Sequence, residues 1–172
     1  MSQNFITLVR EHEESIVRAW VDGMYAEPRT EMPSVLSYGQ LVDHLPDTLQ
    51  EIAAALDQGA TDAEIAEATR RLRAHPQVRF HQGALIDEVA RELIIFRRVF
   101  SDFLWREGFS ATEGDIRELR DALRRADRFV DELLAQVVVV YAASLRPPVA
   151  TRTSVWPPPR RRRTDFPENR RR

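Results

Sequence analysis

Apolar residues recur at intervals of three and four along most of the chain, which is the spacing that one face of an α-helix requires. The pattern predicts helices over residues 4–27, 45–57, 61–76, 84–106 and 112–146, with a helical turn at 39–43 and a short piece ending at Gln82. Nothing alternates with the period of two that a half-buried strand shows. The sequence therefore predicts an all-α single domain of about five to six helices.

Turn and capping residues set the predicted boundaries. Pro46 suits an early position of its helix, and Gln58-Gly59 ends that helix. Thr61 with Glu64 three residues later has the pattern of a capping box. Pro76 is expected to break or kink the helix that follows, and Gly108 to stop the next one. A new helix is then expected from Thr112.

The helix over 84–106 has apolar residues on two sides and is therefore expected at the centre of the domain. One stripe contains Leu85, Val89, Leu93, Phe96, Phe100 and Phe103, and the other contains Ile86, Ala90, Ile94 and Val99. Phe96, Phe100 and Phe103 are candidates for the lining of a small-molecule pocket. Aromatic residues at helical spacing are more commonly plain core, and both interpretations stay open from the sequence.

The last helix carries an uninterrupted heptad pattern over more than three repeats. The predicted dimer seam consists of Leu119, Leu123, Val130, Leu133 and Val137. A second apolar set lies on another side of the helix and contains Phe129, Leu134, Val138 and Tyr141. We expect one side to join the core and the seam to pair two copies in parallel, as a transmission element.

Composition narrows the function classes. Of the 172 residues 43% are hydrophobic and 30% are charged, which is typical of a globular domain. The absence of cysteine excludes disulfides, thiolate catalysis and cysteine-ligated metals. The N-terminus lacks a signal-peptide pattern, and the longest apolar run, 137–144, is shorter than the ~20 residues of a membrane span. The expected location is the cytoplasm.

Charge is divided unevenly along the chain. The net charge is −2 overall and +6 over residues 151–172, which leaves −8 on residues 1–150. An acidic body argues against DNA binding by the folded part. We expect a helical domain over 1–145 and a disordered Pro/Arg-rich tail over 146–172. The tail could bind phosphates, or it could be the product of a frame shift that truncated a longer protein.

Histidines are the side chains most open to a chemical role. His44 lies before Pro46 but does not match the phospho-accepting box of sensor kinases, so capping or packing is the simpler interpretation. His75 and His81 are six residues apart, which does not suit a helical metal pair. His81 is a candidate pocket residue and, as an alternative, a haem ligand. We expect no catalytic residues, no metal and no cofactor.

Several segments together resemble the RsbRD N-terminal domain family. They are Trp20, the run Asp43-His44-Leu45-Pro46 with Leu49 and Ile52, the break from His81 to Gly83, and Leu85 to Arg98 with its Ile94-Ile95-Phe96-Arg97-Arg98 end. Their order and spacing, more than any single motif, carry the resemblance, which covers residues 5–143.

The resemblance implies an all-α sensor domain related to the non-haem globin-like sensors. It implies a homodimer, a regulatory role upstream of a kinase or an anti-sigma-type protein, and no catalysis. No output domain fits after Tyr141, so output is expected in trans or from a longer protein. Two alternatives remain: a protein-interaction adaptor without a ligand, and a haem-binding globin-like sensor.

Overall fold

The computed structural model describes residues 4–57, 59–112 and 115–145 and has only helices in those ranges. In chain order they are α1 (Phe5–Ala26), α2 (Met32–Val35), α3 (Tyr38–Val42), α4 (Leu45–Asp57), α5 (Asp62–Arg71), α6 (Ala74–His81), α7 (Ile86–Phe103), the π-helical turn η1 (Leu104–Gly108), α8 (Phe109–Ala111) and α9 (Ile116–Ser144). The all-α prediction is confirmed. The predicted tail over 146–172 lies outside the described residues.

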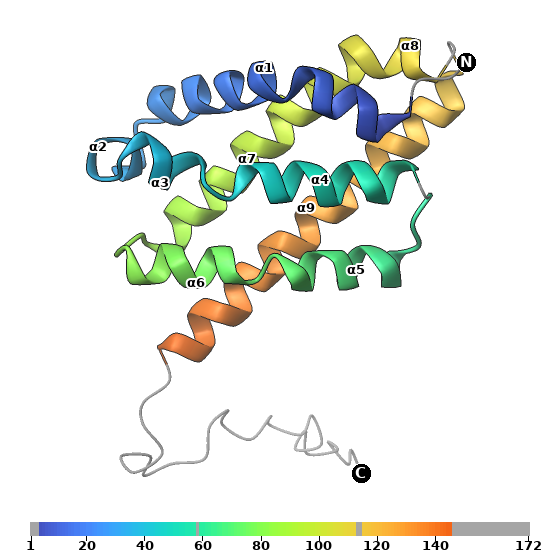
Figure 1. Ribbon diagram of the computed structural model, residues 1–172. Helices are drawn as coiled ribbons and strands as arrows, with labels where there is room; N and C mark the ends of the chain where they lie inside the picture. The colour runs from blue at the N-terminus through green and yellow to red at the C-terminus, as the bar shows by residue number, and fades with distance from the viewer. Residues whose placement is uncertain (1–3, 58, 113–114, 146–172) are drawn as a thin grey trace, which may run out of the picture.

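The helices form two layers. α1, α4 and the pair α5–α6 lie side by side in one layer, and α7 and α9 cross behind them (Figure 1). α7 and α9 are antiparallel, because Tyr141 contacts Ala84 at one end and Leu119 approaches Gly108 at the other. The core lies between the layers and includes Trp20, whose side chain is completely buried. α7 therefore has neighbours on two sides, as its two apolar stripes predict.

Side-chain caps fix the helix starts. The predicted capping box of Thr61 and Glu64 is present, and a second one joins Ser37 to Gln40 at the start of α3. Asp57, at the end of α4, accepts from the backbone N–H groups of Phe5 and Ile6. An acidic group at these free N–H groups is favourable for the α1 dipole. This contact joins the ends of two neighbouring helices.

Glu88 connects α7 to the segment after α1. Its carboxylate accepts from the backbone N–H of Leu85, which caps α7, and from Thr30 and the backbone N–H of Glu31. Burial by itself raises the pKa of Glu88, but these hydrogen bonds outweigh it and hold the pKa below its usual value. The loop between α1 and α2 is thereby held against the first turn of α7.

Some predicted boundaries are wrong. The segment 28–38 contains the short helix α2, in which Pro33 occupies an early position that needs no N–H donor. The break before α6 comes at 72–73, and Pro76 lies within the first turn of α6. Gly108 does not stop its helix. It keeps helical backbone angles, and a Cβ there would lie 3.1 Å from Leu119 Cδ1, so this glycine permits close approach of α9.

The start of the last helix also differs from the prediction. Asp115, not Thr112, is its N-cap, and its side chain accepts from the backbone N–H groups of Arg117 and Glu118. By contrast, Gly59 and Gly83 both have positive φ, as expected for glycines that end helices. Within the described residues no helix combines the length and apolar character needed to cross a membrane.

Candidate functional site

Four ionisable side chains meet inside the core, where α6 and α7 pass the junction of α3 and α4. They are His44, His75, Arg79 and Glu92, called here the buried polar cluster. Arg79 and Glu92 have no exposed side-chain surface, and His44 and His75 keep only 9% and 11% exposed. Charged groups at such depth persist only when they are paired and hydrogen-bonded, so their contacts determine what the cluster can do.

Arg79 uses all five of its N–H donors within the protein. Nε donates to Glu92 Oε2 at 3.1 Å, and Nη2 donates to Glu92 Oε1 and to the carbonyl of Leu41, each at 2.8 Å. Nη1 donates to the carbonyl of Gln40 and to Gln82 Oε1, each at 2.9 Å. This bidentate pair joins α6 to α7, and the two carbonyls join α6 to the end of α3.

The two histidines lie face to face beside this ion pair. The rings of His44 and His75 are 3.8 Å apart between centroids and 15° from parallel, and Trp20 meets His44 edge-on. His44 Nε2 lies 3.1 Å from Glu92 Oε1, and its Nδ1 lies 3.4 Å from Arg79 Nη2. These contacts favour a neutral His44 with its proton on Nε2.

His75 is less completely satisfied than His44. Its Nε2 is buried and lies 3.4 Å from Glu92 Oε1, but it has no hydrogen-bond partner. Its ring also borders a cavity of only about 10 Å³, closed by Thr48, Leu93, Gln136 and other apolar residues. A space of this size accommodates about one water molecule and no organic ligand.

Burial and neighbouring charges act in opposite directions on the two ends of the cluster. Burial lowers the pKa of His44 to about 4, with a further lowering from His75 that Glu92 and Asp43 only partly oppose. Burial raises the pKa of Glu92, but His75, His44 and Arg79 outweigh it and hold this pKa well below its usual range. At neutral pH the cluster therefore consists of a charged Arg79–Glu92 pair beside a neutral His44.

A metal ion is a poor fit for the cluster, although its donor set invites the comparison. One ligand atom each from His44, His75 and Glu92 lies within 4.8 Å of the others. However, an imidazole binds a metal in its own ring plane, and the two stacked planes do not converge on one point. Arg79 already neutralises Glu92, so a dication would leave a buried excess of positive charge.

The cluster as arranged also lacks the features of a catalytic site. A general base needs access to a substrate proton, whereas Glu92 is fully buried and accepts from Arg79. His44 is enclosed as well, which removes it from the reach of a phosphate donor. The geometry supports a structural and electrostatic role for these four residues.

The predicted pocket residues do not come together. Only His44 belongs to the buried polar cluster. His81 is exposed, with its Nδ1 2.7 Å from the carbonyl of Gln77. Phe96, Phe100 and Phe103 are buried in contact with one another, with centroid distances of 5.6 and 5.7 Å between successive rings. They form part of the core, which is the plainer of the two interpretations offered by the sequence.

The predicted dimer seam lies in the core of the monomer. Leu119, Val130, Leu133 and Val137 are buried and Leu123 is partly buried. The second apolar set is divided, because Phe129 and Tyr141 are buried whereas Val138 is exposed. Side chains that fill the monomer core are not free to pair two copies, so any dimer would need another face of α9.

The sequence contained a signal for the cluster that residue-type motifs did not reveal. Glu92 follows Val89 by three residues and precedes Phe96 by four, which places a carboxylate on the apolar stripe of α7. A carboxylate in that position requires a buried cation. His75 and Arg79 are four residues apart and so share one face of α6. The pairing itself depends on tertiary structure.

Comparison with known proteins gives one match. The model of a protein family described as the RsbT co-antagonist protein rsbRD N-terminal domain matches residues 14–153. No curated protein and no solved structure matches the chain. The match includes every residue of the buried polar cluster, and it agrees with the resemblance drawn from the sequence segments.

Proposed function

This chain belongs to the RsbT co-antagonist protein rsbRD N-terminal domain family, and from that premise we propose that it is a non-catalytic regulatory domain that signals by protein contact. The family is one of stressosome-type signalling domains and is not a known enzyme family. The finer proposal is that two copies pair and that the pair acts on a kinase or an anti-sigma-type regulatory protein in the cytoplasm.

The observation that carries the proposal is the exposed apolar surface on the last turns of α9. Val138, Val139 and Leu145 are 56%, 63% and 72% exposed, while Val137 and Tyr141 on the same turns are buried. A helix that is apolar on all sides is normally covered on all sides. This end of α9 is therefore suited to contact a second protein surface.

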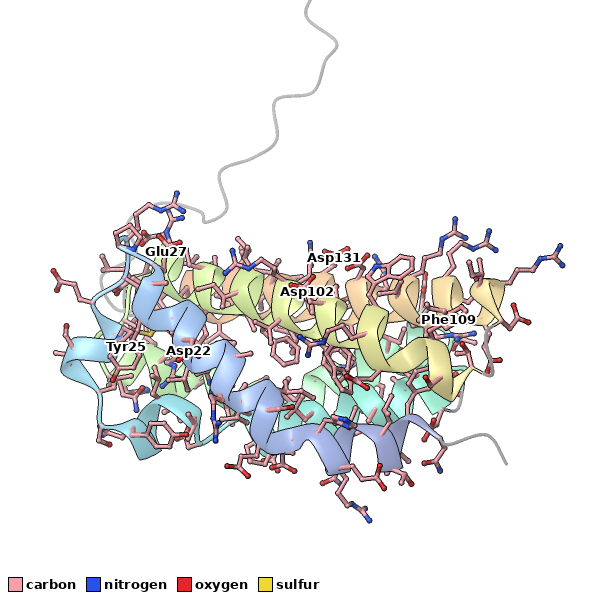
Figure 2. The ribbon with its side chains drawn as sticks, turned by 90° about the horizontal axis from the view of Figure 1, so that it is seen from above. Asp22, Tyr25, Glu27, Asp102, Phe109 and Asp131 are labelled. Atoms are coloured by element: carbon pink, nitrogen blue, oxygen red, sulfur yellow. The ribbon has the colours of Figure 1, made fainter. Side chains whose placement is uncertain are left out.

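The neighbouring helix extends this surface. Arg97 of α7 pairs with Asp131 of α9, and α7 and α9 are antiparallel. Ile94, one turn before Arg97, is consequently next to the turns of α9 that follow Asp131, and it is 53% exposed. Figure 2 shows Asp131 and Asp102 along the edge of the α7–α9 layer that faces away from α1. We define Ile94, Val138 and Leu145 as the α7–α9 face.

The occupant that we propose for the α7–α9 face is a second copy of the chain. Two such faces related by a two-fold axis bring α9 against α9, which gives an isologous contact of four helices. The small size of the enclosed cavity beside His75 supports signalling by contact over sensing of an internal organic ligand. It favours the adaptor alternative more than the haem alternative, for which exposed His81 offers no enclosed ligand position.

The test is the mass of the protein in solution by analytical ultracentrifugation at about 20 µM. We expect a dimer for the wild type and a monomer for Val138→Asp, because a carboxylate in the interface would be desolvated without a partner. Ile116→Asp is the matched control, since Ile116 is an equally exposed apolar residue at the other end of α9. A monomeric wild type, or a dimeric Val138→Asp variant, contradicts the proposed face.

A further inference from the structure

The stacked pair of His44 and His75 has a property that the structural role of the cluster does not require. Two imidazoles 3.8 Å apart cannot both carry a proton at this depth without strong repulsion. Arg79, already positive, lies within 3.4 Å of His44. The closed arrangement therefore tolerates fewer protons than the same residues would bind if they were exposed to water.

Charged groups from every neighbouring element face the pair. Arg79 comes from α6, Glu92 from α7 and Asp43 from the junction before α4, with Asp43 Oδ1 3.6 Å from His44 Nδ1. From α9, Tyr141 interacts with the charges of Glu92 and Arg79. Glu92 is the only buried anion among them, and its carboxylate is already bound by Arg79. It cannot compensate for two additional positive charges.

α6 is the element that both histidine contacts and α9 share. It carries His75 and Arg79 on one side, and on the other Phe80 packs edge-on against Tyr141 of α9 at 5.3 Å. Just after α6, the carbonyl of Ala84 accepts from the Tyr141 hydroxyl at 2.7 Å. Displacement of α6 would thus remove the contacts that hold the last turns of α9 in place.

From this geometry we propose that the His44–His75 pair is an acid-sensitive latch: protonation of both rings releases α6 from the α3–α4 junction and α7, and so frees the last turns of α9. The release of α6 is a property of this domain alone. Its consequence for a partner rests on the proposed function, because the α7–α9 face includes those turns of α9.

The test is amide hydrogen exchange of the full chain at pH 7.5 and 5.5, with rates corrected for the intrinsic pH dependence of exchange. We expect opening of α6 and of the last turns of α9 to increase about tenfold at pH 5.5, because an exposed histidine with a pKa near 6.5 binds a proton that buried His44 rejects. The first half of α1, which the cluster does not contact, should change much less.

Two variants separate the latch from general acid sensitivity. His44→Gln with His75→Gln keeps amide donors for Glu92 but cannot be protonated, so its exchange in α6 should be the same at both pH values. His81→Gln removes an exposed histidine of the same helix and should respond like the wild type. An undiminished acid response in the double variant, or none in the wild type, overturns the latch.

A second measurement keeps the proposal testable if the double variant does not fold. Carbon-detected or proton–carbon spectra of the wild-type histidine rings report the protonation of each ring as pH falls. We expect the second proton to enter the pair together with loss of protection in α6. Two charged rings in a domain whose α6 remains protected would contradict the latch. Neither outcome depends on dimer formation, so failure of the latch and failure of the α7–α9 face are distinguishable.

Discussion

α7 holds the core together in two different ways along its length. Near its middle, Glu92 binds Arg79 and meets His44 through directed contacts that allow one geometry. One to three turns later, Phe96, Phe100 and Phe103 fill space with rings that touch at tilted and stacked angles. Aromatic packing stabilises a compact core without specifying charge, whereas the cluster specifies which helices meet and in which protonation state.

This difference predicts different consequences of mutation. Contacts in the aromatic layer are lost in proportion to the volume removed. In the cluster, loss of one partner leaves another charge buried and unpaired, which costs more than the pair itself contributes. Restoring neutrality should therefore rescue a cluster variant, whereas no second substitution should rescue a truncated phenylalanine by charge balance.

The largest expected effect is from Arg79→Met. It leaves the Glu92 carboxylate without its bidentate partner, and we expect the free energy of unfolding to fall by about 3–5 kcal/mol. Arg79→Met with Glu92→Leu should recover most of this loss, because it removes both buried charges. Urea denaturation of the two single variants and the double variant measures the coupling. Additive losses in the double variant would mean that the two residues do not act as a pair.

Phe100→Ala provides the comparison from the aromatic layer. We expect a loss of similar size, about 3–5 kcal/mol, from lost burial and the cavity that remains. Unlike the Arg79 variant, it should keep the pH dependence of the wild type, because it leaves every ionisable contact in place. The measurement is urea denaturation at several pH values, and a changed pH dependence would show that the two parts of α7 are not independent.

The pH dependence of stability is the next effect in size. In the unfolded chain a histidine binds a proton with a pKa near 6.5, while folded His44 does so only near 4. The unfolded state therefore binds more protons between these values, and stability falls as the pH drops from about 6.5 to 4. The loss from this residue is about 3 kcal/mol at most. Glu92, with its lowered pKa, adds to the loss only at still lower pH.

His44→Gln is the variant that checks this assignment. Its free energy of unfolding should vary less between pH 7 and 5 than that of the wild type, whereas His81→Gln should follow the wild type. Urea denaturation across this range gives both values. Equal pH dependence in all three proteins would remove His44 as the source.

The smallest effect concerns a place where neither charge nor aromatic packing decides. A Cβ on Gly23 would lie 2.7 Å from Ile95 Cγ2, so α1 and α7 approach as closely as glycine permits. We expect Gly23→Ala to cost about 1–2 kcal/mol by forcing the helices apart. Gly39→Ala is the control, because a Cβ there meets nothing within 4 Å and the substitution should be neutral or slightly stabilising. Thermal or urea unfolding compares them.

The sequence predicts the elements better than their partners. Periodicity and caps place most of the helices, and the double stripe of α7 places it at the centre, because these are local patterns. The heptad pattern of α9 is also present, but periodicity does not say whether a stripe faces the core or a second molecule. Leu119, Val130 and Val137 face the core.

Two kinds of feature could not be predicted from local pattern. The pairing of Arg79 with Glu92, and of His44 with His75, joins residues 13 and 31 positions apart on different elements. Only the packing of α6 against α7 and the α3–α4 junction brings them together. Glu92 on an apolar stripe indicates that a buried cation exists, but the sequence offers many arginines and no rule to select one.

The protonation state of His44 at neutral pH tests the central claim most directly. Long-range proton–nitrogen spectra distinguish the two neutral tautomers from the charged ring. We expect His44 to be neutral at pH 7 with its proton on Nε2, directed at Glu92, and to stay so until the pH falls well below 6. A charged His44 at pH 7, or a proton on Nδ1, would contradict the closed, charge-balanced cluster on which the account depends.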